Sequence, residues 1–180
     1  MYQKLLLAAS IPAAPAGFDD WKYMEPTFFL FAIPVVFLYG ICIGSFLNVV
    51  IIRLPIGESL TKRASHCMTC GTKIRIIDLI PVFSWLFLKG KCHSCGEKIS
   101  PRYPIVETLN GLLYVADFLI FGLTANMFIM CIFTSVLVVV GFMDWDTQEM
   151  DMRVLLVIVL LVIPSYFASE LTIADRLIGA

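Results

Sequence analysis

The stretch FFLFAIPVVFLYGICIGSFLNVVII, residues 28–52, decides the fold, because it holds no charged side chain. At the rise of about 1.5 Å per residue of an α-helix, a run of this length crosses the roughly 30 Å hydrocarbon core of a bilayer. Gly40, Gly44 and Asn48 follow at intervals of four and share one stripe. The glycines predict close helix packing, and the asparagine predicts a hydrogen bond across that interface. Arg53 then marks the membrane surface.

The rest of the chain has the composition of a membrane protein. Of its 180 residues, 59% are hydrophobic, against about half in a soluble domain. Further apolar runs at 104–121, 127–143 and 154–167 predict three more spans. We therefore expect an all-α, polytopic membrane protein with about four transmembrane helices, which has the lipid bilayer as a partner. The net charge of −1 gives no field that favours nucleic acid, so no nucleic-acid partner is expected.

The polar segment at 54–103 is basic. Nine of the 13 lysines and arginines lie between Arg53 and Arg102, so the positive-inside rule places this segment in the cytoplasm. Its middle, residues 76–88, is apolar but too short to span. We expect it to lie against the membrane face or to pack on the cysteine turns beside it.

The two ends of the chain complete the predicted organisation. Residues 1–26 are expected to be an extracytoplasmic or interfacial lead-in before the first transmembrane segment at 27–53. Beyond the basic segment, residues 104–180 hold the other spans. Residues 177–180 are expected to begin a fifth helix.

Two matching cysteine pairs lie in the basic segment. The sequences CMTCG and CHSCG place Cys67, Cys70, Cys92 and Cys95 in a repeat, with a glycine after each pair. A two-residue spacer lets both thiolates of a pair reach one ion, and four cysteines complete the tetrahedral shell of a structural zinc site. A redox-active dithiol pair and two internal disulfides remain alternatives.

The stretch at 143–153, MDWDTQEMDMR, gathers acids between two apolar runs. On a continuing helix, Asp144 and Asp151 would share one face and Asp146 would point away. Two carboxyl groups about 3 Å apart that share a proton can activate water for peptide hydrolysis. Asp144 is the candidate for one half of such a pair. The alternative is a solvated acidic loop at the membrane surface.

A polar stripe runs along the second predicted span. Glu107, Asn110, Tyr114 and Asp117 are spaced three or four apart and so lie on one helical face. Ionisable groups on a spanning helix are expected to face the bundle interior or a wet cavity. Two interpretations stay open: the stripe lines a functional site, or it is a structural polar seam between helices.

Several of these motifs together resemble the prepilin leader peptidases, a family of integral-membrane aspartic peptidases. The motifs occur in the order that the family shows. They are GSFLNVVIIRLP at 44–55, SHCMTC at 65–70, DLIPVFSW at 78–85, KGKCHSC at 89–95, ISPRYPIVE at 99–107 and DWD at 144–146.

The resemblance implies an enzyme of the bacterial cytoplasmic membrane. Such enzymes cut the short basic leader from type IV prepilins or pseudopilins at the cytoplasmic face. Many then methylate the new N-terminus with S-adenosylmethionine. The resemblance implies that Asp144 is a catalytic aspartate, and that Cys67, Cys70, Cys92 and Cys95 are the metal ligands. It also makes Gly90 and Glu107 weaker candidates for the methyl-transfer site.

The sequence also departs from the family's pattern. The second aspartate of the family lies in a GxGD motif, and no GxGD occurs here. Asp146 and Asp151 are weak substitutes. We therefore expect residues 104–180 to be the N-terminal part of the peptidase domain of a longer enzyme, and this chain alone to be inactive. Two other functions stay open: a membrane-anchored zinc-knuckle interaction module without catalysis, and a thiol–disulfide membrane protein.

Overall fold

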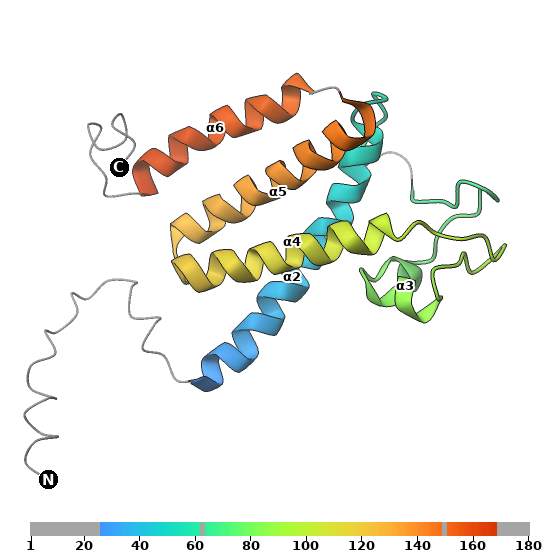
Figure 1. Ribbon diagram of the computed structural model, residues 1–180, viewed down its shortest axis with the longest axis horizontal. Helices are drawn as coiled ribbons and strands as arrows, with labels where there is room; N and C mark the ends of the chain where they lie inside the picture. The colour runs from blue at the N-terminus through green and yellow to red at the C-terminus, as the bar shows by residue number, and fades with distance from the viewer. Residues whose placement is uncertain (1–25, 62–63, 149–150, 169–180) are drawn as a thin grey trace, which may run out of the picture.

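The computed structural model describes residues 26–61, 64–148 and 151–168. Of the expected lead-in at 1–26, residues 1–25 lie outside them, as does the expected start of a fifth helix at 177–180. The described residues form helices and loops, with two isolated β-bridges. The elements are α2 (Pro26–Arg53), the short 3-10 helix η2 (Ile76–Leu79), α3 (Phe83–Phe87), α4 (Arg102–Phe121), α5 (Ala125–Thr147) and α6 (Met152–Ala168). The predicted all-α class is confirmed (Figure 1).

Three helices, α2, α4 and α5, are long and apolar enough to cross a membrane. They correspond to the first three predicted spans, so the chain is a multi-pass membrane protein. The fourth predicted span appears as α6, whose 17 residues rise about 25 Å. Figure 1 shows α4, α5 and α6 side by side, with α2 crossing α4.

The glycine stripe of α2 packs directly on α4, as the sequence predicted. A Cβ added at Gly40 would meet Cα of Gly111 at 2.7 Å, and one added at Gly44 would meet Cα of Glu107 at 2.7 Å. The asparagine of the same stripe, Asn48, donates from Nδ2 to the carbonyl of Tyr103 across the interface, at 3.1 Å. The two backbones therefore approach as closely as small residues permit.

This contact predicts a difference between two glycine substitutions. Gly44→Leu forces a side chain into the backbone of α4, and we expect a loss of about 1–3 kcal/mol in the free energy of unfolding. A Cβ at Gly141 of α5 meets nothing within 4 Å. Gly141→Ala is therefore expected to be neutral or to stabilise by up to about 1 kcal/mol. Thermal unfolding in detergent measures both. A Gly44→Leu protein as stable as the parent contradicts the packing argument.

One helix does not continue through the acidic stretch, so the condition under which Asp144 and Asp151 would share a face is not met. Helix α5 ends at Thr147, and Gln148 takes a left-handed conformation with φ 53° and ψ 21°. Its N–H donates to the carbonyl of Asp144 at 2.9 Å and closes the last turn. Asp151 lies outside both helices, directly before α6. Asp144 and Asp151 thus do not share a helical face.

Candidate functional site

The acidic stretch and the basic segment meet at one end of the helix bundle. Asp146, in the last turn of α5, forms an ion pair with Arg102, the first residue of α4. The guanidinium carbon of Arg102 also lies 5.5 Å from the centre of the Phe142 ring, a cation–π distance. Asp146 therefore serves to hold α4 against α5.

Asp151 also has an arginine partner. Its carboxylate accepts hydrogen bonds from the backbone N–H of Arg153 at 2.8 Å and from that residue's Nη2 at 2.7 Å. These bonds hold the pKa of the Asp151 carboxyl below its usual value. The same Nη2 donates to the carbonyl of Leu54 at 3.0 Å. Asp151 thus caps the start of α6, and Arg153 joins that cap to the end of α2.

Asp144 differs from these two acids. Its side chain is exposed at the last turn of α5, and it makes no hydrogen bond or ion pair with the described residues. Trp145 beside it is 87% exposed. Of the three aspartates, Asp144 is the one whose carboxylate is left available for a water molecule or a second carboxyl group.

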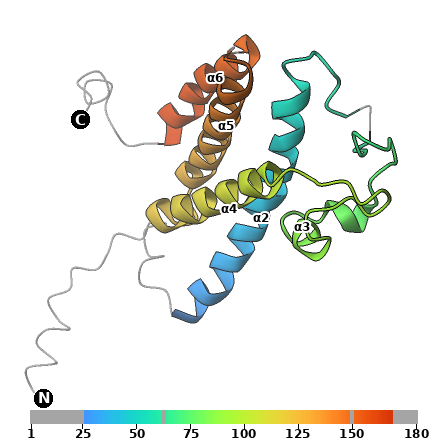
Figure 2. The ribbon, with the colours of Figure 1, turned by 45° about the vertical axis from the view of Figure 1, so that its right-hand side comes forward.

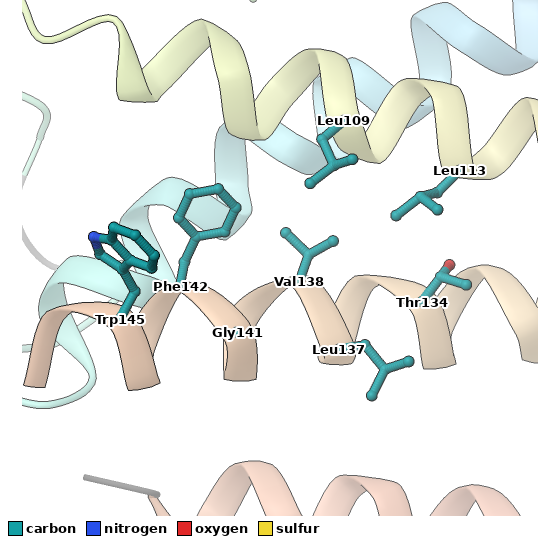
Figure 3. A pocket seen from close by; sticks show the side chains of 8 residues that line it. All are labelled: Leu109, Leu113, Thr134, Leu137, Val138, Gly141, Phe142 and Trp145. Atoms are coloured by element: carbon teal, nitrogen blue, oxygen red, sulfur yellow. The ribbon is translucent and has the colours of Figure 1, made fainter. Parts of the chain in front are cut away.

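An apolar groove runs along the bundle as far as Trp145, the residue that follows Asp144 in the sequence (Figure 3). It has a volume of about 350 Å³ and lies between α4 and α5. Its lining residues are Leu109 and Leu113 of α4 and Thr134, Leu137, Val138, Gly141, Phe142 and Trp145 of α5. The groove is open at Gly141, where an added Cβ would meet no atom within 4 Å. The groove ends at Trp145, the neighbour of Asp144.

The two cysteine pairs fold into the same backbone turn. The N–H of Cys67 donates to Thr72, and the N–H of Cys92 donates to Glu97, at 3.0 and 2.7 Å. The glycines that follow the pairs, Gly71 and Gly96, have φ values of 70° and 73°. Only glycine adopts this conformation readily, which explains why each pair is followed by one. The internal repeat in the sequence is therefore also a repeat in structure.

The four cysteine sulfurs gather at one point. Each lies within 4.8 Å of the other three, and the Sγ atoms of Cys67 and Cys95 are 3.8 Å apart. A zinc ion with four Zn–S bonds of about 2.3 Å needs sulfurs about 3.8 Å apart. Hydrogen bonds with Thr72 lower the pKa of the Cys70 thiol to about 6. The residues present therefore fit a tetrahedral metal ion.

Gly90 supports the second cysteine turn. It has a φ of 67°, and a Cβ there would lie 2.9 Å from Cζ2 of Trp85. The indole N–H of Trp85 donates to the carbonyl of Ile99 at 3.1 Å. The N–H of Ile99 in turn donates to Gly90 at 2.7 Å. The ring of Trp85 fills the space beside Gly90.

Glu107 joins the basic segment to the helix bundle. Its carboxylate is buried in α4 and accepts a hydrogen bond of 2.6 Å from the backbone N–H of Val82. Val82 has a φ of 62°, which is rare for a β-branched residue. This contact, and the pairing of Arg102 with Asp146, are absent from the sequence-based prediction. The apolar stretch 76–88, interrupted by a proline, signals a bend but not which carboxylate meets it.

The rest of the polar stripe on α4 is a seam between helices. The side-chain amide of Asn110 donates to the carbonyl of Gly40 at 2.7 Å and accepts from the hydroxyl of Ser135 at 3.0 Å. The hydroxyl groups of Tyr114 and Ser135 are 3.0 Å apart. Asp117 accepts a hydrogen bond from Thr134 at 3.0 Å. These contacts satisfy the buried polar groups of Asn110, Tyr114 and Asp117, as a structural polar seam between helices requires.

The fold and the site define a membrane protein with an acidic helix end and a four-cysteine segment on the same side of its bundle. Residues 38–121 match the family described as Bacterial Peptidase A24 N-terminal domain. The chain belongs to this family of bacterial prepilin peptidases. No solved structure matches the chain.

Several relatives are named prepilin leader peptidase/N-methyltransferase, including proteins from three bacterial species. The protein from Myxococcus xanthus is 42% identical over 124 residues, which cover 69% of this chain and 36% of the relative. The protein from Bacillus subtilis is 34% identical over 122 residues, covering 68% of this chain and 49% of the relative. The protein from Pseudomonas putida is 33% identical over 185 residues, covering 89% and 63%. The chain thus spans between about a third and three fifths of the length of these relatives.

Proposed function

We propose that these 180 residues form the N-terminal part of a prepilin leader peptidase, an aspartic endopeptidase that removes the basic leader of type IV prepilins or pseudopilins. The observation that carries the proposal is the environment of Asp144. Arginines neutralise Asp146 and Asp151, whereas Asp144 is exposed and has no partner among the described residues. The names of the relatives support the substrate.

In this proposal, Asp144 supplies one carboxyl group of a catalytic pair. One group of such a pair takes a proton from the attacking water, and the other stays protonated and polarises the scissile carbonyl. The partner carboxyl group belongs to a part of the enzyme beyond these residues. Because Asp146 and Asp151 are bound to arginines, neither is proposed as the partner. The chain alone is therefore expected to be inactive.

The charged residues support a cytoplasmic position for the basic segment and the acidic stretch. Arg102 pairs with Asp146, and Arg153 reaches Leu54, so the basic segment and the acidic stretch share one side. The many lysines and arginines of the basic segment favour the cytoplasm. The basic leader of a prepilin is therefore proposed to meet Asp144 at the cytoplasmic face of the bacterial plasma membrane.

The four cysteines are proposed to hold a structural zinc ion. The proposal is supported by their sulfurs, which lie within 4.8 Å of one another, with one pair 3.8 Å apart, the separation in a tetrahedral zinc site. Bound zinc supplies a cross-link between the two turns and no reactive group. Methylation of the new N-terminus is proposed from the names of the relatives alone. Gly90 and Glu107 are proposed to shape the segment through Trp85 and Val82.

A cleavage assay tests the proposal. The enzyme translated from the complete reading frame, placed in membrane vesicles with a prepilin-like substrate, is expected to release the leader peptide, as followed by mass spectrometry. The 180-residue chain under the same conditions is the matched control and is expected to release none. If the complete enzyme binds zinc but cleaves nothing, the alternative of a membrane-anchored zinc-knuckle interaction module replaces the peptidase.

The apolar groove is the proposed path for the substrate's hydrophobic helix. It runs between two spanning helices and ends at Trp145, beside Asp144, so an apolar helix in the bilayer would bring its leader junction to the carboxylate. We expect Gly141→Leu, which fills the groove, to raise KM for a prepilin substrate about 10-fold, because a lost hydrophobic contact weakens binding by about 1–3 kcal/mol.

The matched control is Gly141→Ala, which leaves most of the groove open and is expected to keep the KM of the parent. Thermal unfolding of both variants separates a blocked groove from a damaged fold. Unchanged cleavage by a stable Gly141→Leu enzyme shows that the substrate helix binds elsewhere, without overturning the role of Asp144.

A further inference from the structure

The basic segment carries an exposed apolar surface between its two cysteine turns. Seven large hydrophobic side chains of residues 76–87 are exposed. They are Ile76, Ile77, Leu79, Ile80, Phe83, Leu86 and Phe87. The side chains of Ile76 and Phe87, at the two ends, are 87% and 82% exposed. Contiguous apolar surface of this kind marks a site of interaction with a protein or a membrane.

We propose that residues 76–87 form an interfacial anchor, which buries these side chains at the boundary between the lipid headgroups and the acyl chains. Helices α2 and α4, which flank the basic segment, already fix it beside a bilayer. The proposal concerns a lipid-binding surface. It does not depend on the peptidase activity.

The depth of the segment follows from its contact with α4. The N–H of Val82, in the middle of the segment, donates to the carboxylate of Glu107 at 2.6 Å. Glu107 lies five residues into α4 after Arg102, which corresponds to about 7.5 Å along the helix axis. Interfacial segments bury their apolar face about 5–10 Å into the headgroup and acyl boundary. With Arg102 at the membrane surface, this hydrogen bond would hold the segment at that depth.

A second contact holds the segment beside the start of α4. Trp85 donates from its indole N–H to the carbonyl of Ile99, just before α4. Figures 1 and 2 both show α3 beside the first turns of α4, at the end of the bundle where the cysteine turns extend away from it. The apolar side chains thus lie beside the entry of a spanning helix, where the surrounding medium is lipid.

The charges around the segment fit an anionic membrane surface. The acid within it, Asp78, is bound by Arg75 through two hydrogen bonds of 2.8 and 2.9 Å. This pairing lowers the pKa of the Asp78 carboxyl and neutralises its charge. Lys73 precedes the segment, and Lys89 and Lys91 follow it, all exposed. Lysines at both ends of an apolar surface attract lipid phosphates.

Tryptophan fluorescence tests the anchor. The parent is the full chain with Trp21 and Trp145 replaced by phenylalanine, reconstituted in phosphatidylglycerol–phosphatidylcholine vesicles. Phe87→Trp adds a probe within the segment. Met68→Trp adds one on the first cysteine turn, at a residue that is equally exposed, at 83%. Ile76→Trp serves as a second probe of the segment if Phe87→Trp disturbs the fold.

The expected result is that the probes in the segment and the probe at position 68 differ in their exposure to the two quenchers. Emission added at position 87 or 76 should shift to the blue and be quenched several-fold more by lipids brominated on their acyl chains than emission added at position 68. Aqueous iodide should show the reverse order. Equal quenching of both sites by iodide overturns the proposal. Protection of position 87 from both quenchers also overturns it, because a protein partner or a second copy of the chain then covers the surface.

Discussion

Asp144→Asn in the enzyme from the complete reading frame should reduce prepilin cleavage by about 10²- to 10⁴-fold, the range lost when a group that moves protons is removed. The reason is the chemistry of the amide, which has the shape of a carboxylate but neither takes nor shares a proton. Because the Asp144 side chain is exposed and has no partner among the described residues, its removal breaks no contact there. The measurement is the rate of leader release by the reconstituted enzyme.

The two neighbouring aspartates are the matched controls. Asp146→Asn breaks the ion pair with Arg102, and Asp151→Asn weakens the cap bound by Arg153. Both are expected to lower the thermal stability of the protein while leaving most of its cleavage rate. If Asp144→Asn cleaves as fast as the parent, or if Asp146→Asn is the variant that loses activity, the assignment of Asp144 is wrong.

The second large effect concerns the four cysteines. The purified chain is expected to carry about one zinc ion, and Cys95→Ser is expected to lose most of it, because a closed site needs all four ligands. Structural zinc contributes about 10 kcal/mol or more of apparent binding free energy in small sites at neutral pH. Loss of the metal should therefore unfold the two cysteine turns. Elemental analysis and the protease sensitivity of residues 64–100 measure both effects.

A cysteine outside the cluster provides the control. Cys42 lies in α2, away from the four clustered sulfurs, so Cys42→Ser should keep the zinc and the protease resistance of the parent. A parent protein without zinc, whose clustered cysteines react rapidly with an alkylating reagent, would instead support the thiol–disulfide interpretation. A zinc content unchanged by Cys95→Ser would mean that the metal is bound elsewhere.

The sequence predicted the features that depend on local periodicity and short spacings. The charge-free run at 28–52, the glycine stripe with Asn48 and the repeated cysteine pairs all appear in the structure as expected. Each follows from a rule that acts over a few residues: the length of a span, the pitch of a helix, or the reach of two thiolates.

The features that escaped prediction depend on contacts between distant residues. Arg102 pairs with Asp146, 44 positions away, and Val82 meets Glu107, 25 positions away. Nothing in the sequence pattern around Arg102 or Val82 indicates which acid it contacts. The end of α5 escaped because Gln148 takes a left-handed conformation, and glutamine is not a residue that signals such a stop.

The tight contact between α2 and α4 has a consequence for the zinc affinity proposed for the cysteine segment. The segment begins after Arg53, the last residue of α2, and ends at Arg102, the first residue of α4. The packing of Gly40 and Gly44 against α4 therefore holds its two ends near each other in the absence of metal. A chain already closed at its base loses less conformational entropy when the two turns meet. The packed membrane helices would thus hold the two cysteine turns in position for metal binding. A substitution that loosens the contact between α2 and α4 should weaken zinc affinity even though no cysteine has changed.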